Sequence, residues 1–177
     1  MLRKILLAHD GSDHADKALD LAVTLARATG SELRILNVVS AGPLTEGELA
    51  LAETEYRNEV HRGLGDLELL PVGGPQWTGV GTLLETRPEL GPTVHRVLGE
   101  QIVRQAAAEA CAKGADRVTT AVESGDPASV IVSQAREAKA DLVVLGSRGL
   151  SDLKGLLLGS VSHKVANTAE CSVVTVK

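Results

Sequence analysis

Aromatic side chains are almost absent from this chain of 177 residues, which has no phenylalanine, one tryptophan and one tyrosine. Single-stranded nucleic acids are bound largely by stacking bases on aromatic rings, so this scarcity disfavours such a platform. Basic residues are also in the minority, with 18 Lys and Arg against 23 Asp and Glu and a formal net charge of −5. Because no basic stripe offers a footprint for a phosphate backbone, we expect no nucleic-acid partner.

Cysteine is scarce as well. Cys111 and Cys171 have neither CxxC spacing nor nearby histidines, so the sequence predicts no zinc or redox motif, and we expect both to be buried as small hydrophobic residues. The first residues, MLRK, lead into an apolar run without a signal pattern. No apolar run approaches the length of a membrane span. We therefore expect a cytoplasmic protein with no membrane insertion.

What the chain does contain is small aliphatic residues: 44% of it is apolar, almost all Ala, Val, Leu and Ile. Such a core is typical of parallel strands covered by helices on both faces. The length favours a single domain, spanning residues 1–177.

Short apolar runs alternate with helical patterns along the chain. The runs predict five strands, over Lys4–Ala8, Glu32–Val39, 117–122, 142–145 and Ser172–Val176. The patterns between them predict helices from Ser12 or Asp13 to Gly30, over 46–62, over 93–114, from an Asp126 N-cap with Pro127 to about residue 140, and over Ser160–Thr168. This alternation predicts an α/β fold with a doubly wound, five-stranded parallel sheet and helices on both faces.

Residues 64–92 break the alternation. They contain several Pro-bearing turns and paired glycines, with weak periodicity. We expect an irregular excursion here, and the sequence leaves open whether it is an ordered insertion, a lid or a mobile loop.

Two glycine-bearing turns stand out near the end of the chain. The stretch LGSRGLSDLKGLLLGSV places Gly146, Gly149 and Gly159-Ser160 in the spacing G-x2-G-x9-G-S, starting directly after a predicted strand. Glycine permits close approach of a ligand to the backbone, and a helix that starts at Ser160 would offer unpaired N–H groups to an anion. From spacing alone, two interpretations remain open: a phosphate cradle, or turns needed only to stop and start elements.

Position in the predicted sheet favours a binding site. Ligands of doubly wound sheets bind beyond the carboxyl ends of the strands, where strand order reverses. The turn that contains Asp10, the end of the second strand at Val38, and the loop after Gly146 would converge there. Asp10 can accept a hydrogen bond from a ribose hydroxyl or an adenine amino group, and the Ser160 hydroxyl can ligate a metal held by phosphates.

These residues carry a resemblance to the universal stress protein family. The resemblance covers KILLAHDGSDHADKALDLAVTLA, the second strand LRILNVV, and nearly everything from residue 121 onward, with the spacing G-x2-G-x9-G-S of the family's ATP-binding branch. It implies strand order 3-2-1-4-5, a fold like that of the adenine nucleotide alpha hydrolases, and bound ATP or another adenine nucleotide, with Mg²⁺ or Mn²⁺ possible. It also implies a homodimer formed through Ser172–Val176.

Carried over by position, the resemblance implies roles for individual residues. Those at the adenosine half are Asp10, with Ala8 and His9 lining it, Val38 at the base and Gly146 at the ribose. Those at the phosphates are Ser147, Arg148, Gly149, Gly159, Ser160 and Val161, with Ser160 near the metal. Many ATP-binding members have proline where Ala8 stands, so the first turn is expected to be less rigid here.

Three functions remain open. The first is a nucleotide-dependent stress-response or signalling module that binds ATP and acts through its dimer on a protein partner the sequence does not name. The second is a slow ATPase or phosphotransfer enzyme, and the third is a nucleotide-free dimeric scaffold. Phosphoryl transfer needs positioned charge, yet neither a general base nor an arginine finger can be assigned from spacing. We therefore expect no catalytic residues, and at most weak ATP hydrolysis.

Overall fold

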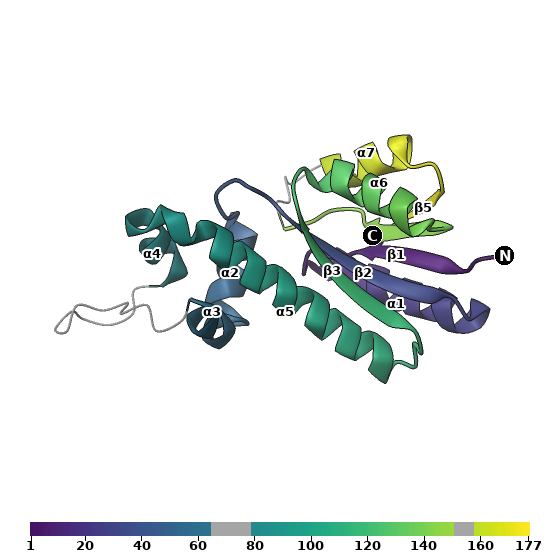
Figure 1. The fold of residues 1–177 in the computed structure, drawn as a ribbon, viewed down its shortest axis with the longest axis horizontal. Coiled ribbons are helices and arrows are strands. Elements are labelled where there is room, and N and C mark those ends of the chain that lie inside the picture. Colours follow the sequence, from purple (N-terminus) through teal and green to yellow (C-terminus); the bar gives the residue numbers. More distant parts are fainter. Residues whose placement is uncertain (65–78, 151–157) are drawn as a thin grey trace.

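The protein is built around a five-stranded parallel sheet in the order β3-β2-β1-β4-β5 (Figure 1). The computed structural model describes residues 1–64, 79–150 and 158–177. The strands are β1 (Lys4–Ala8), β2 (Glu32–Val39), β3 (Val118–Ser124), β4 (Leu142–Gly146) and β5 (Ser172–Val176). The predicted fold class and strand order are confirmed.

The centre of the sheet is its most buried part. Strand β1 pairs with β2 and with β4, so that Leu7 lies between Ile35 and Val144. All three of these side chains are fully buried. Aliphatic side chains on both faces of these strands supply the hydrophobic driving force for folding.

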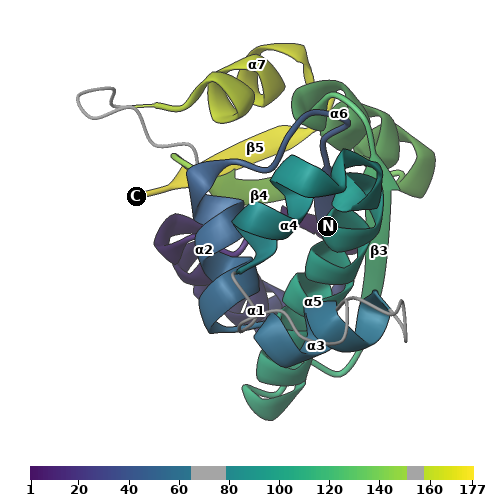
Figure 2. The ribbon, with the colours of Figure 1, turned by 90° about the vertical axis from the view of Figure 1, so that its left-hand side faces the viewer.

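Helices cover both faces. On one face, α1 (Asp13–Thr29) and α5 (Gly91–Ala112) pack on the sheet in one apolar cluster, and on the other α6 (Pro127–Ala138) and α7 (Ser160–Thr168) form a second cluster (Figure 2). The predicted helix ends are confirmed at α1, where Ser12 caps the first turn and Gly30 ends the helix with a φ of 67°. Helix α6 starts as expected, with an Asp126 N-cap that accepts from Ser129 N and with Pro127 at its first position.

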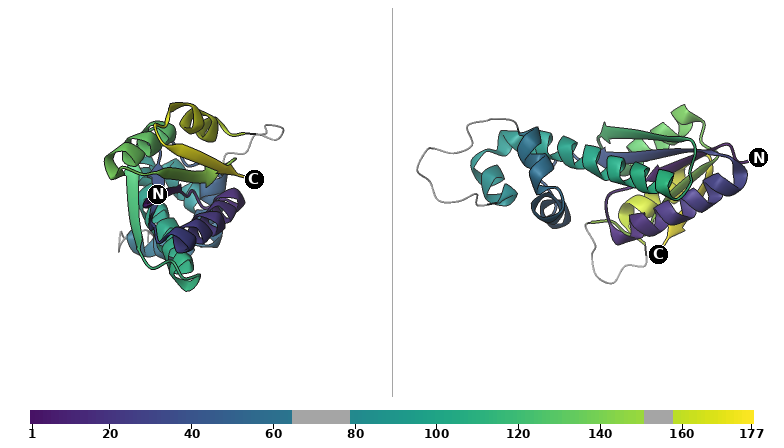
Figure 3. Two further views of the ribbon diagram at one scale, coloured as in Figure 1. Left: turned by 90° about the vertical axis from the view of Figure 1, so that its right-hand side faces the viewer. Right: turned by 90° about the horizontal axis from the view of Figure 1, so that it is seen from below.

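The connection from β2 to β3 builds a helical lobe beyond one end of the sheet (Figure 3). It contains α2 (Glu46–Thr54), α3 (Arg57–Gly63), α4 (Val80–Thr86), the 3₁₀ turn η1 (Pro88–Leu90) and the first half of α5. These elements share a third apolar cluster, centred on residues such as Val60, Val80 and Val94.

One prediction for this lobe was wrong. The single helix expected over 46–62 is divided at Tyr56, whose φ of −113° and ψ of 20° turn the chain between α2 and α3. The Tyr56 hydroxyl donates to Gln105 on α5 at 2.5 Å, so a contact distant in the sequence fixes this corner. The excursion expected at 64–92 contains α4 and η1, while its residues 65–78 lie outside the described part of the chain.

Smaller corrections concern strand β3 and the cysteines. Strand β3 runs to Ser124 rather than to residue 122, because it continues to pair with β2 as far as Val39. Cys111 is exposed and Cys171 is half-buried, so the expectation of two buried cysteines was wrong. Cys111 lies on the last turn of α5, on a side that faces away from the sheet.

Within the ranges that the structure describes, no helix is long and apolar enough to cross a membrane.

Candidate functional site

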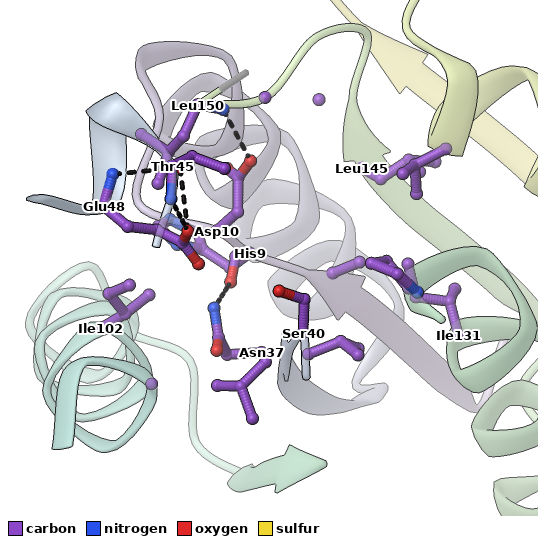
Figure 4. A pocket seen from close by; sticks show the side chains of 18 of the residues that line it. His9, Asp10, Asn37, Ser40, Thr45, Glu48, Ile102, Ile131, Leu145 and Leu150 are labelled. Carbon is purple, nitrogen blue, oxygen red and sulfur yellow. Dashed lines mark hydrogen bonds between the residues drawn. The ribbon is translucent and has the colours of Figure 1, made fainter. Parts of the chain in front are cut away.

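A cavity of about 320 Å³ lies at the carboxyl ends of β1, β2 and β4 (Figure 4). This is the size of a small-molecule site, and it occupies the position where doubly wound sheets bind ligands. The structure brings nearly all of the predicted site residues together on its wall. They are Ala8, His9, Asp10, Val38, Gly146, Arg148, Gly149, Gly159, Ser160 and Val161.

Ser147 is the exception. Its side chain is 1% exposed and does not line the cavity, and among the described residues its hydroxyl has no hydrogen-bond partner. Its backbone is fully engaged: the N–H donates to Val176 O at 2.6 Å, and the C=O accepts from Gly159 N at 2.7 Å and from Ser162 Oγ at 2.9 Å. Ser147 therefore positions the loop instead of presenting its side chain to a phosphate.

Asp10 joins the two halves of the site through its own hydrogen bonds. Its Oδ1 accepts from the N–H of Ser12 at 3.1 Å and from the Ser12 hydroxyl at 2.7 Å. Its Oδ2 accepts from Leu150 N at 3.2 Å, across the cavity. A carboxylate oxygen accepts about two hydrogen bonds, so Oδ2 retains capacity for one more donor, such as a ribose hydroxyl.

His9 is held within the protein. Its Nδ1 accepts from Gly11 N at 3.3 Å, which leaves the proton on Nε2, and Nε2 faces Asp16 Oδ1 at 3.2 Å in an imperfectly aligned contact. This contact with His9 lowers the pKa of Asp16. The backbone C=O of His9 accepts from Asn37 Nδ2 at 2.9 Å. With both ring nitrogens occupied, His9 forms a wall and is poorly placed to act as a general base.

The motif glycines are required by the protein's own packing. A Cβ on Gly146 would lie 2.9 Å from the backbone carbon of His14, and one on Gly149 would lie 2.3 Å from Asp10 Oδ2. At Gly159 it would lie 3.2 Å from Ser147 O. None of these three glycines has a positive φ. Close contact with neighbouring atoms, on α1, in the turn after β1 and in the loop itself, therefore selects glycine here, rather than backbone conformation.

The N-terminus of α7 forms a further part of the wall. Its N-cap is Gly159, and no side chain caps it among the described residues, whereas Ser12, Thr45 and Asp126 cap α1, α2 and α6. The first N–H groups of a helix lack partners within the helix, and the helix dipole favours negative charge beside them. The start of α7, at Ser160 and Val161, therefore offers N–H groups and an exposed hydroxyl to the cavity.

The rest of the wall is largely apolar. On the side of α6 and α7 it is formed by Val38, Pro127, Ile131, Leu145 and Val161. On the opposite side it is formed by residues that sequence reasoning missed, namely Thr45, Glu48, Leu51, His95, Leu98, Gly99 and Ile102. In the sequence, the pattern T-x-x-E at Thr45 and Glu48 is typical of a capping box. It was the one pattern that could have indicated a helix start on this second side.

A dedicated metal centre is absent from the ranges described, where no group of three His, Cys, Asp or Glu side chains could hold an ion. Ser160 supplies one hydroxyl oxygen at the cavity wall. Mg²⁺ is commonly bound by one or two protein oxygens together with substrate phosphates and water. The residues present therefore fit a metal that arrives with a nucleotide, and do not fit a resident one.

Comparison with known proteins identifies the family. The model of the universal stress protein family matches residues 1–177. The chain is 34% identical to universal stress protein YxiE of Bacillus subtilis, with all of both chains covered. The UspA structure from Lactobacillus plantarum has a TM-score of 0.67 at 22% identity and covers 99% of this chain and 98% of its own. A universal stress protein solved in complex with cAMP has a TM-score of 0.61 at 26% identity and covers 99% and 97%. This chain therefore belongs to the universal stress protein family.

Proposed function

We propose that this protein binds an adenine nucleotide, ATP in particular, in the cavity at the carboxyl ends of β1, β2 and β4. One observation carries the proposal: the cavity connects an apolar slot to the uncapped N-terminus of α7. An adenosine group fits the first part and phosphates fit the second. The structure of a related family member with cAMP supports the same class of ligand.

The wall residues divide naturally between the two parts of such a ligand. The base would lie by Val38 and Ile131, and the ribose by Gly146 with one hydroxyl on Asp10 Oδ2. The phosphates would lie along Arg148, Gly149 and the first turn of α7. The Ser160 hydroxyl would help to hold Mg²⁺ or Mn²⁺ that arrives with the phosphates, and the charge of the ion would lessen repulsion between them.

Binding, and not turnover, is the proposed activity. The histidine nearest the first strand, His9, has both ring nitrogens engaged within the protein. The protein would then act as a stress-response module whose conformation reports the nucleotide to a protein partner. Incubation of purified protein with ATP and Mg²⁺, followed by separation of ADP, checks this. ADP formation that is lost in a variant unable to bind ATP would favour the slow ATPase.

The experiment that tests binding adds one negative charge to α7. Ser160→Asp places a carboxylate in the first turn, where it stabilises the helix dipole but repels phosphates. We expect ATP affinity, measured by calorimetry, to fall at least about tenfold while the melting temperature is unchanged or higher. Thr93→Asp, in the first turn of α5 and off the cavity wall, is the control and should leave affinity unchanged. A wild-type protein that binds no adenine nucleotide would overturn the proposal and favour a nucleotide-free scaffold.

We also propose that two copies pair through β5. This strand is at the edge of the sheet, and its residues Val173, Val174 and Val176 are half-buried in the single chain. An open strand edge offers unpaired backbone groups to a second copy. Sedimentation of wild type and Val174→Lys tests this, with a dimer expected for wild type and a shift toward monomer for the variant. A monomeric wild type would contradict it.

A further inference from the structure

The second side of the cavity is formed by α2 and the chain just before it. Glu48 in the first turn of α2 completes a capping box, with Oε2 accepting from Thr45 N at 2.7 Å and from Thr45 Oγ1 at 2.9 Å. The other oxygen, Oε1, lies 3.5 Å from Nδ1 of His95 on α5. One carboxylate therefore both starts α2 and ties it to α5.

His95 makes a second contact with the same segment. Its Nε2 lies 3.1 Å from Gly42 O, and because a carbonyl oxygen only accepts, Nε2 carries a proton. Its Nδ1 faces the Glu48 carboxylate, so a proton there is favoured as well. The contact with Glu48 raises the pKa of His95, against an opposing effect of burial. Burial acts to raise the pKa of Glu48, but the ion-pair contact with His95, which lacks hydrogen-bond geometry, and the hydrogen bonds from Thr45 lower it overall.

At its other side, α2 rests on the loop after β4, called the glycine loop, whose described residues are 147–150. A Cβ on Gly47 would lie 2.8 Å from both the Cβ and the backbone oxygen of Leu150, so helix and loop are in close contact. Leu150 is in turn hydrogen-bonded through its N–H to Asp10 (Figure 4). Helix α2 therefore connects α5 to the loop that would hold the ligand, and Thr45, Glu48 and Leu51 present this connection to the cavity.

We propose that α2 acts as a clasp, meaning that it covers one side of the nucleotide cavity and retains the ligand. The Glu48–His95 ion pair holds α2 in this position and sets how fast bound nucleotide is released. The inference rests on the proposed function, because it concerns retention of the same ligand. Glu48 and His95 are positioning residues: they act on the ligand through α2 and Leu150.

The charged surroundings make this pair sensitive to pH. The titratable side chains on the cavity wall are His9 and Asp10 after β1, Glu48 on α2, His95 on α5 and Arg148 in the glycine loop. In the described residues, α3 and α4 contribute no charged side chain to that wall. Because the pKa of His95 is raised, the Glu48–His95 ion pair is fully formed at lower pH and is lost as the pH rises through that pKa. The Glu48 carboxylate loses its charge only in acid, where the pH falls below its lowered pKa.

Release of radiolabelled ATP during a chase with unlabelled ATP tests the clasp. We expect the release rate of Glu48→Gln to be about tenfold that of wild type near pH 6, because the amide keeps the Thr45 contacts but loses the ion pair. From about pH 6 to about pH 9 the wild-type rate should rise toward that of the variant. The ratio of the two rates at each pH cancels the titration of ATP itself. Glu100→Gln, which removes an exposed pair with Arg96 on the same helix, should behave as wild type.

The outcomes separate the two proposals. If wild type binds ATP and the two rates are equal at every pH, the clasp is overturned and the nucleotide site stands. If wild type binds no adenine nucleotide at any pH, both fail. Should Glu48→Gln not fold, His95→Gln takes its place, since its amide can still donate to Gly42 O. With either variant, a ratio of variant to wild-type rate that does not change with pH would itself count against the clasp.

Discussion

Asp10 and Leu150, which are 140 residues apart in the sequence, are joined by a hydrogen bond of 3.2 Å from the Leu150 N–H to Asp10 Oδ2. This contact ties the turn after β1 to the loop after β4. Gly149 makes it possible, because a side chain at that position would meet the same carboxylate oxygen. The hydrogen bond thus arranges the two parts of the candidate site relative to each other.

The first prediction concerns that contact. Gly149→Ala would place a methyl group 2.3 Å from Asp10 Oδ2 and force the carboxylate away from Leu150. We expect the free energy of unfolding, measured in urea, to fall by about 1–3 kcal/mol, and ATP affinity to fall with it. The control is Gly91→Ala, where a Cβ has no neighbour within 4 Å. Equal stability of Gly149→Ala and Gly91→Ala would show that the loop accommodates the methyl group.

A second prediction concerns the helical lobe. A Cβ on Gly63 would lie 2.3 Å from Cγ2 of Val97, where α3 crosses α5. Gly63→Ala should cost about 1–3 kcal/mol of stability. In a Val97→Ala background the same change should cost less, by at least about 0.5 kcal/mol, because the clashing methyl is gone. Strict additivity in the double-mutant cycle would rule out this contact as the cause.

The cap of α1 gives a third prediction. Ser12 Oγ accepts from Ala15 N and also donates to Asp10 Oδ1. Ser12→Ala should lower stability by about 1 kcal/mol through loss of the cap. Asparagine is as good a cap as serine, so Ser12→Asn should recover most of that loss. Thermal unfolding of the three proteins distinguishes them, and an Ala variant as stable as wild type would show that the cap contributes little.

The fourth prediction is the pH dependence of the free protein. Because Glu48 raises the pKa of His95, the pair stabilises the fold fully below the unfolded-state pKa of histidine. This stabilisation is lost as pH rises through the folded-state value. Urea midpoints measured from about pH 6 to about pH 9 should therefore converge for wild type and His95→Gln. A difference between them that does not change with pH would mean that folding does not shift the pKa of His95.

The sheet and one side of the site could be predicted from sequence because their signals are local. Each strand is an apolar run that ends in a turn, and the carboxyl ends of parallel strands meet at one edge. Ala8, Val38 and Gly146 reach the cavity for that reason alone. Ser147 belongs to the same loop, but its direction depends on contacts with β5 and α7 that no local pattern reveals.

The second side could not be predicted, because its residues are distant in the sequence. In the sequence, no local pattern distinguishes His95 from its neighbours in a predicted helix. Only the tertiary fold brings it to Glu48. The corner at Tyr56 depends similarly on Gln105. The motif glycines were interpreted as openings for a ligand, whereas His14, Asp10 and Ser147 are what exclude a side chain at them.

The backbone of Ser147 gives the edge of the sheet a mechanical link to the start of α7. Its N–H holds the end of β5 at Val176, and its C=O holds Gly159 and Ser162. Displacement of the first turn of α7 therefore disturbs Ser147 and, through it, the last residue of the edge strand, and a partner that pairs with β5 acts on the same residue from the other side. The backbone of one residue, Ser147, therefore links the edge strand of the sheet to the helix start at which a phosphate would bind.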